Sequence, residues 1–372
     1  MGADQEVGYE GGRVGLKPER FHDAIASLLA QVGLTGQFEI FPLRGGMNNR
    51  VFRIDLIGSQ VCLKVYFQHP DDPRDRLGTE FSFCRFAWNK GVRALPQPLA
   101  CDPQNSLALY EFIGGHQLQP GEVTRDVVQQ ALDFYRDLNR SRDDPEARDL
   151  PKASEACFSI AEHLRRVKYR LDRLLAVEES SSIHREAVRF VRKDAWGVWG
   201  KLVEWVQRQA DQLQLPLEEE IPRSDWRLSP SDLGFHNGLL AVDGRFRFID
   251  FEYAGWDDPD RLVCDFFCQP AVPVPFDYFD MFAHTVATEL TEPATQLKRM
   301  GLLFPVYQVK WCCILLNDFL PPGSERRRFA DGTSTQEERQ AEQLAKARKV
   351  LRPLMKPNGD IRIEPRPSRV FQ

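Results

Sequence analysis

Residues 228–250 read LSPSDLGFHNGLLAVDGRFRFID, and this stretch decides the fold. Its Asp243-Gly244 pair stands between two apolar runs and predicts a β-hairpin with a two-residue turn. Counting outward from that turn, Asn237 faces Asp250. Directly opposed residues share one face of a hairpin, with Cβ atoms roughly 5 Å apart. We therefore expect Asn237 and Asp250 to lie side by side, with Asp250 pointing inward like the phenylalanines of its strand.

The polar residues of this stretch have the types that phosphoryl transfer requires. A carboxylate (Asp250) beside a carboxamide (Asn237) offers two hard oxygen ligands, as magnesium prefers. Asp232 precedes Asn237 by five residues, and a carboxylate there could accept the proton of an attacking hydroxyl. An Asp, an Asn five residues later and an Asp after a hairpin form the catalytic pattern of kinases. The alternative is structural, with Asp232 and Asn237 as turn residues and Asp250 at a strand end.

A lysine and a glutamate further upstream predict a buried ion pair. Lys64 lies in a strand, on the face opposite to that strand's apolar residues, and Glu80 lies within the apolar stripe of a helix over 76–90. That stripe consists of Leu77, Phe81, Cys84 and Trp88. A carboxylate on an apolar face is costly unless it is paired. A strand lysine paired with a helix glutamate is the arrangement that kinases use to hold ATP phosphates. The alternative is that both side chains reach solvent.

Two other segments predict contacts with a nucleotide. Gly45 and Gly46 separate two predicted strands, and glycines allow backbone amides to approach phosphate oxygens. The alternative for this pair is a plain hairpin turn. The predicted strand over 107–113 falls where a hinge would offer backbone groups to adenine, so Glu111 and Ile113 are candidate nucleotide-binding residues.

The order of predicted elements indicates an α+β, two-lobed, protein-kinase-like fold. An antiparallel, sheet-rich N-terminal lobe over 1–113, with 1–17 loose, precedes a mostly helical C-terminal lobe over 114–372 that holds the catalytic and acceptor sites. The first lobe is expected to hold a helix over 18–34 and strands over 38–43, 51–57, 61–67 and 107–113. The second is expected to hold helices over 123–140, 158–177 and 183–215, a strand pair near 239–250, and helices again from about 276.

These motifs resemble those of the aminoglycoside phosphotransferase and choline kinase superfamily, over about residues 38–320. In that family the catalytic loop usually reads His-Gly-Asp with Asn five residues later, whereas residues 230–237 read PSDLGFHN. The metal segment usually reads Ile-Asp-Phe/Trp-Glu and then Gly-x-x-Asp-Pro, and residues 249–259 read IDFEYAGWDDP. Residues 45–49, GGMNN, resemble the family's Gly-Gly-x-x-Asn loop.

The resemblance implies an ATP- and magnesium-dependent kinase that phosphorylates a hydroxyl of a sugar, amino sugar or amino alcohol. It implies Asp232 as the catalytic base and Asn237 and Asp250 as magnesium ligands. It also implies that Lys64 binds the ATP phosphates, that Glu80 positions Lys64, and that Asn49 and the glycine pair lie over the nucleotide. Pro230 stands where the family usually has a histidine, which puts the geometry of the loop in question.

The acceptor is less well defined by the sequence. Acidic and aromatic residues near the metal segment could hold a cationic acceptor: Phe235, Tyr253, Trp256, Asp257, Asp258 and Asp260. The alternative for the three aspartates is a loop and a helix cap. Gln308, Lys310 and Asn317 lie on a predicted core helix and could also reach an acceptor cleft, whereas Asp265 is expected to be structural.

Composition excludes several other classes of protein. The chain is 42% hydrophobic and 28% charged with a formal net charge of -5, which gives no basic footprint for nucleic acid. No signal sequence and no apolar run of roughly 18 residues is evident, so a cytoplasmic protein with reduced thiols on its eight cysteines is expected.

A silent pseudokinase that binds nucleotide or a partner protein is the alternative function. A kinase acting on protein is disfavoured because no Ala-Pro-Glu segment follows Asp250.

Overall fold

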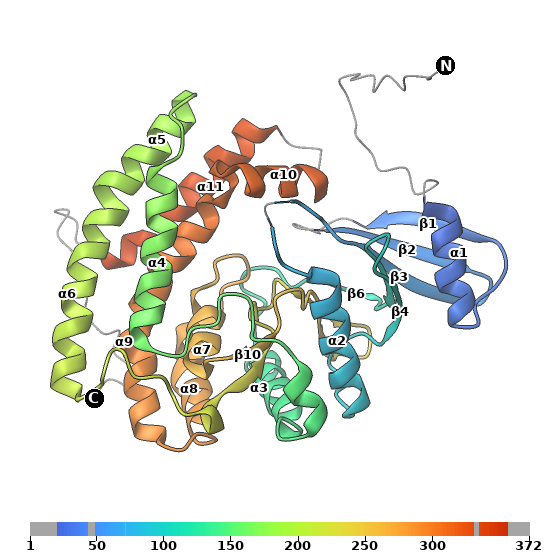
Figure 1. Ribbon diagram of the computed structural model, residues 1–372, viewed down its shortest axis with the longest axis horizontal. Coiled ribbons are helices and arrows are strands. Elements are labelled where there is room, and N and C mark those ends of the chain that lie inside the picture. Colours follow the sequence, from blue (N-terminus) through green and yellow to red (C-terminus); the bar gives the residue numbers. More distant parts are fainter. Residues whose placement is uncertain (1–20, 44–48, 71, 331–334, 356–372) are drawn as a thin grey trace.

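The computed structural model describes residues 21–43, 49–70, 72–330 and 335–355, and Gly45 and Gly46 lie outside these ranges. Five antiparallel strands form the sheet of the N-terminal lobe, in the order β1-β2-β3-β5-β4 (Figure 1). Their bounds are β1 Phe38–Leu43, β2 Arg50–Leu56, β3 Ser59–Val65, β4 Pro98–Asp102 and β5 Leu107–Glu111. Strand β4 was not predicted because it begins with Pro98, a residue that sheets accept only at an edge.

Two helices cover opposite faces of this sheet. Helix α1 (His22–Gln31) buries Ile25 and Leu28 against one face, in a core shared with Leu63 of β3. Helix α2 (Arg76–Asn89) lies on the other face, between the sheet and the helical lobe (Figure 1). Because side chains alternate along a strand, Lys64 lies on the α2 side while its neighbours pack under α1.

The C-terminal lobe is mostly helical, as predicted. Its helices are α3 Arg125–Arg140, α4 Ile160–Leu175, α5 Ser182–Phe190, α6 Trp196–Leu213, α7 Pro259–Cys268, α8 Phe279–Ala287, α9 Pro293–Leu315, α10 Pro321–Ala330 and α11 Gln336–Leu351. A π-helical turn, Val191–Ala195, divides the predicted helix over 183–215 into α5 and α6. Helix α7 begins well before the predicted start of the later helices, because the Asp258 side chain caps it by accepting from the Asp260 N–H.

Helix α9 is the central helix of this lobe and packs against α4, α6, α7, α8 and α11. Together with the turn that follows it, residues 293–319 are long and apolar enough to cross a membrane, a run that the sequence analysis overlooked. Since 89% of its apolar window is buried inside the protein, this segment is the core helix of the lobe.

Short strands carry the catalytic stretch. They are β6 Gly115–His116, β7 Arg227–Ser229, β8 Gly238–Ala241, β9 Phe246–Phe248 and β10 Gly255–Asp257. Strand β6 pairs with β8 and β8 with β9, whereas β7 pairs with β10.

The predicted register of the β8–β9 hairpin is wrong by one residue. Gly238 faces Phe248, and the Ala241 N–H donates to the Arg245 carbonyl, so three residues form the turn instead of two. The third of them, Gly244, has a φ of +76°, the left-handed conformation that three-residue hairpin loops require. Asn237 consequently lies opposite Ile249, whose N–H donates to the Asn237 carbonyl at 3.0 Å, and not opposite Asp250.

Candidate active site

Lys64 joins the two lobes through a buried ion-pair cluster. Its Nζ lies 2.6 Å from Glu80 Oε2 on α2 and 2.6 Å from Asp250 Oδ1 just after β9. The Tyr66 hydroxyl donates to the same Glu80 oxygen at 2.9 Å. Lys64 and Glu80 are both buried, so the predicted contact between them is confirmed and the solvent-exposed alternative is wrong.

The electrostatics of this cluster follow from burial and unlike charge. Burial alone would lower the pKa of Lys64, but the carboxylates of Asp250 and Glu80 outweigh it and raise that pKa. Burial raises the pKa of Glu80 to about 7, with Lys64 opposing the rise. Lys64 therefore stays cationic, and the site holds a fixed positive charge among carboxylates.

Asp232 is half-buried in the catalytic loop. His236 Nε2 lies 3.4 Å from Asp232 Oδ1, and Asn237 Nδ2 donates to the Asp232 carbonyl at 3.0 Å. Burial acts to raise the pKa of Asp232, but His236 and Asn237 outweigh it and lower that pKa. The carboxylate is thus ionised at neutral pH and able to accept a proton. The His236 ring has room here because Gly234 has no side chain. A Cβ at this position would lie 2.5 Å from His236 Nδ1.

The residue before Asp232 is held in a strained conformation. Ser231 has a φ of +67°, in the left-handed region that favours glycine, and it stands where the resembling family has glycine. Arg261 Nη2 donates to Ser231 Oγ at 2.7 Å, and the Ser231 N–H donates to Ser229 Oγ at 2.9 Å. Sequence reasoning missed Arg261, which lies on α7 and pairs with Asp257 at the end of β10. The hydrogen bond from Arg261 helps to hold Ser231 in this left-handed conformation.

Asn237 and Asp250 fit a magnesium ion only in part. Asn237 uses its amide nitrogen on the Asp232 carbonyl, which leaves the carboxamide oxygen as an acceptor, and Asp250 supplies a carboxylate. Within the described part of the chain, no group of three or more His, Cys, Asp or Glu side chains could hold a metal ion. Magnesium commonly binds through one or two carboxylates together with substrate phosphates, and this donor set is compatible with that mode.

Asn49 forms a tie between the lobes. Its Nδ2 donates to Glu252 Oε2 at 2.7 Å, and its Oδ1 accepts from the Phe67 N–H at 3.1 Å. Arg76 Nη1 donates to the other Glu252 oxygen at 2.7 Å. Asn49 is 2% exposed, and both ends of its amide are bonded within the protein, while its position over a nucleotide stays a prediction. Arg76 and Glu252 were missed, although Glu252 lies in the motif 249–259.

The predicted hinge is partly used by the sheet itself. The Glu111 N–H donates to the Gln97 carbonyl at 2.8 Å, and Glu111 Oε2 accepts from the Gln97 N–H at 3.1 Å. The N–H of Glu111 is therefore bonded within the protein, and the contact of Glu111 with a nucleotide stays a prediction. Ile113 follows β5 and remains a prediction.

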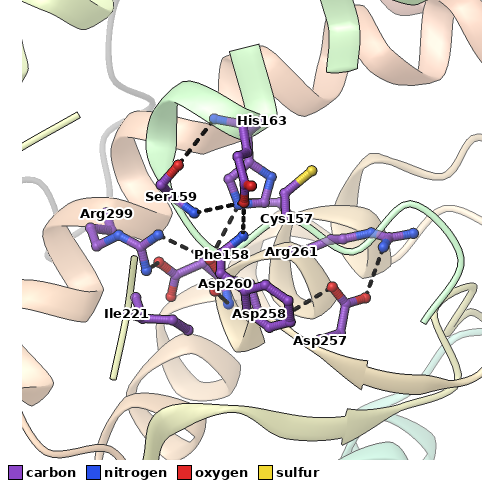
Figure 2. Close-up of polar contacts among 12 residues, drawn as sticks. Cys157, Phe158, Ser159, His163, Ile221, Asp257, Asp258, Asp260, Arg261 and Arg299 are labelled. Atoms are coloured by element: carbon purple, nitrogen blue, oxygen red, sulfur yellow. Dashed lines mark hydrogen bonds and ion pairs between the residues drawn. The ribbon is translucent and has the colours of Figure 1, made fainter. Parts of the chain in front are cut away.

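The aspartates after the metal segment do not form a cationic-acceptor site. Asp257, Asp258 and Asp260 are all 0% exposed, and Figure 2 shows them turned toward buried cations. Asp257 pairs with Arg261 at 2.9 Å, while Arg299 contacts Asp258 at 2.9 Å and Asp260 at 2.7 Å. The helix-cap alternative is confirmed. Asp265 is structural as expected; it accepts from Lys310 Nζ, at 2.7 Å, and Trp311 Nε1, at 2.8 Å.

The lowered pKa of Glu155 predicts that the stability of the protein depends on pH. Burial would raise the pKa of this carboxylate, but Arg170, which contacts it directly, and Lys310 outweigh burial and lower it from 4.5 to about 2. A lowered pKa in the folded state stabilises the protein above pH 4.5, and this contribution is lost as the pH falls toward 2. We expect Glu155→Gln to lower the free energy of unfolding at pH 7 by up to about 3 kcal/mol.

Urea unfolding of both proteins across this pH range checks that expectation. The difference in the free energy of unfolding between wild type and Glu155→Gln should become smaller as the solution is acidified. Glu179→Gln, which removes an exposed contact with Arg192 at 3.4 Å, is the control and changes stability little at any pH. If the difference in the free energy of unfolding stays constant with pH, the lowered pKa of Glu155 is contradicted.

Comparisons with known proteins place this geometry in a fold. No protein-family model matches the chain, and no curated protein matches it. Among solved structures, choline kinase from Cryptosporidium parvum Iowa II has 12% identity and a TM-score of 0.54, over 89% of this chain and 96% of that one. The chain has the fold of the choline kinases and aminoglycoside phosphotransferases.

Two further structures agree with that statement. Spectinomycin phosphotransferase APH(9)-Ia in complex with ADP and spectinomycin has 11% identity and a TM-score of 0.52, covering 91% of this chain and 95% of that one. Plasmodium vivax ethanolamine kinase has 12% identity and a TM-score of 0.52, with 89% of each chain covered. At such identities the likeness establishes the fold, and the α+β, two-lobed, kinase-like fold predicted from the sequence is confirmed.

Proposed function

We propose that the protein is a small-molecule kinase that transfers the γ-phosphoryl group of ATP to a hydroxyl of a small acceptor. The observation that carries the proposal is Lys64, whose Nζ lies 2.6 Å from both Glu80 and Asp250. This contact brings a strand lysine, a helix glutamate and the aspartate after the catalytic hairpin together in the arrangement that kinases use. The solved structures of the same fold, which act on choline, ethanolamine and spectinomycin by their names, support it.

The chemistry assigns a role to each residue of the site. Asp232, ionised, accepts the proton of the acceptor hydroxyl, whose oxygen forms a bond to the γ-phosphorus. The bond from that phosphorus to the β–γ bridging oxygen breaks, and ADP leaves. Lys64, held by Glu80, binds the phosphate oxygens and offsets their charge. Asn237 and Asp250 would hold a magnesium ion, which neutralises charge on the phosphates when bound.

The pseudokinase alternative rests on Pro230 alone. The Lys64 cluster and the ionised Asp232 argue against it, since a protein that only binds a partner does not need both a cation fixed between two carboxylates and an ionised carboxylate in the catalytic loop.

The test is transfer of labelled γ-phosphate from ATP with magnesium into a pool of sugars, amino sugars, amino alcohols, sugar acids and polyol phosphates. Label in a small molecule supports the proposal and identifies the acceptor. Label only in an added protein pool indicates a protein kinase. ATP binding without transfer to any compound or to water favours the pseudokinase.

A further inference from the structure

Tyr66 connects the ion pair of Lys64 and Glu80 to the sheet of the N-terminal lobe. It directly follows β3, two residues after Lys64, so strand alternation directs both side chains to the α2 side. The Tyr66 N–H donates to the Ser106 carbonyl at 2.9 Å, which fixes the backbone at this point. Tyr66 is 4% exposed, and Lys64 Nζ lies 5.1 Å from the centroid of its ring. Tyr66 therefore contacts Lys64 with its ring and Glu80 with its hydroxyl.

A second tyrosine extends this contact into a chain of hydroxyl groups. The hydroxyl oxygens of Tyr66 and Tyr110 lie 2.8 Å apart, and Tyr110 lies on β5, the neighbour of β3 in the sheet. Each phenol has one proton to donate, whereas an ionised carboxylate has none. Since Tyr66 donates to Glu80 at 2.9 Å, Tyr110 must donate to Tyr66. Burial raises the pKa of both tyrosines well above the usual value, so both protons stay in place at neutral pH.

Glu80 depends on these donors because burial disfavours its charge. Its Oε2 accepts from Lys64 Nζ at 2.6 Å as well as from Tyr66. Burial raises the pKa of Glu80 to about 7, so its charge is easily lost near neutral pH. A hydrogen bond donated to a carboxylate favours the ionised form, and Tyr66 supplies one. A neutral Glu80 would no longer attract Lys64, which Asp250 also contacts at 2.6 Å.

Other charged and titratable side chains also act on Glu80. They are Lys64, Cys62 and Tyr66 from β3, Tyr110 from β5, Cys84 from α2 itself, and Asp250 and Glu252 after β9. Burial raises the pKa of both thiols, so they stay neutral near pH 7. Among the described residues, the Tyr66 hydroxyl bonds to Glu80 and Tyr110 and to neither of the other two carboxylates. Removing this hydroxyl consequently acts on Glu80 first.

We propose that Tyr66 is a positioning residue of the kinase site, whose hydroxyl, supported by Tyr110, keeps Glu80 ionised and turned toward Lys64. This inference rests on the proposed function and adds two residues to the lysine, glutamate and aspartate that kinases use. Tyr66 touches neither substrate in this role and acts through Glu80. A phenylalanine would fill the same space in a role of packing alone, so the hydroxyl is the group to test.

The first experiment compares Tyr66→Phe with wild type in the labelled transfer assay, between about pH 5 and about pH 9. The substitution keeps the ring beside Lys64 and removes only the hydroxyl. Below pH 7 we expect kcat/KM for ATP to fall about tenfold, the effect of one hydrogen bond to a charged group, with KM for the acceptor unchanged. The difference should shrink as the pH rises, because Glu80 then ionises in the variant as well. Asp232 is ionised throughout this range, so the shift reports Glu80.

Two further variants test whether the hydroxyl chain acts as a unit. Tyr135→Phe is the matched control, because it removes a buried tyrosine hydroxyl on α3, outside the Lys64 cluster, and should leave the pH profile unchanged. Tyr110→Phe should shift the profile in the same direction as Tyr66→Phe, by a smaller factor of about two to three. It should have no further effect in the Tyr66→Phe protein, because Tyr110 acts only through Tyr66.

Urea unfolding of the same proteins tests the role of Tyr66 without the reaction. Because the pKa of Glu80 is raised from 4.5 to about 7, its side chain is protonated in the folded protein at low pH and offers the hydroxyl no charge to stabilise. The loss of urea midpoint in Tyr66→Phe should therefore be small near about pH 5 and grow as the pH rises through 7. A loss of equal size at every pH indicates packing alone and overturns the inference.

The outcomes separate this inference from the function beneath it. A Tyr66→Phe protein with the kcat/KM and pH profile of wild type overturns the positioning role and leaves the kinase intact. A wild type that binds ATP and transfers phosphate to no compound overturns the kinase assignment and the positioning role with it, even where urea unfolding links Tyr66 to the charge of Glu80.

Discussion

Asp232→Asn is expected to abolish phosphoryl transfer while leaving ATP binding nearly unchanged. The amide has the size of the carboxylate and keeps the backbone contact with Asn237, but it cannot accept the hydroxyl proton. General-base catalysis contributes about 10²–10⁴-fold, so the rate should fall by at least this range. The lowered pKa of Asp232 keeps the wild-type carboxylate ionised throughout the neutral range. The asparagine side chain does not titrate, so raising the pH should not restore the variant.

The measurement is labelled transfer beside equilibrium binding of ATP. Asp243→Asn, in the exposed hairpin turn, is the matched control and should retain full activity. Thermal unfolding of both variants tests whether loss of the contact with His236 disturbs the fold. An Asp232→Asn protein that turns over like wild type would remove this residue from the chemistry.

The sequence predicted the features that depend on local chemistry. Glu80 lies in an apolar stripe, and burial makes an unpaired carboxylate so costly that a cation had to be near it. Lys64 was the available partner because strand alternation placed it on the face that meets α2. The two-lobed layout was also predictable, because the spacing of apolar residues changes from the period of strands to that of helices after the first lobe.

The features that the sequence did not predict depend on contacts between distant segments or on a single dihedral angle. The hairpin register depended on whether Gly244 adopts a left-handed conformation, which the Asp-Gly pair allows but does not dictate. Asn49 is bonded to Glu252, 203 residues away, and no local pattern shows that partner. Asp258 and Asp260 looked available to a ligand because Arg299, which neutralises them, lies about forty positions later.

Lys64→Met is expected to have the largest combined effect on stability and activity. The substitution leaves Glu80 and Asp250 without the cation that lies 2.6 Å from each. Removing one partner of a buried ion pair typically costs about 3–5 kcal/mol, because the remaining charge is uncompensated. Phosphoryl transfer should be lost as well, since no other cation of this cluster can reach the phosphates. Lys90→Met is the control, because Lys90 pairs with Asp144 and Glu146 near the surface, and its loss should change stability little.

The double variant Lys64→Met/Glu80→Gln separates the two effects. In the wild type the pKa of Glu80 is raised from 4.5 to about 7, so its ionised form costs stability, and this cost grows as the pH rises from 4.5 toward 7. Without Lys64 the cost is larger, so the Lys64→Met protein should regain stability on acidification, and Glu80→Gln should restore much of it at neutral pH. Transfer should not return, because neutralising Glu80 supplies no cation for the phosphates. Urea unfolding and labelled transfer on the four proteins of this cycle decide the matter: recovery of both stability and activity would show that Lys64 serves only to neutralise Glu80.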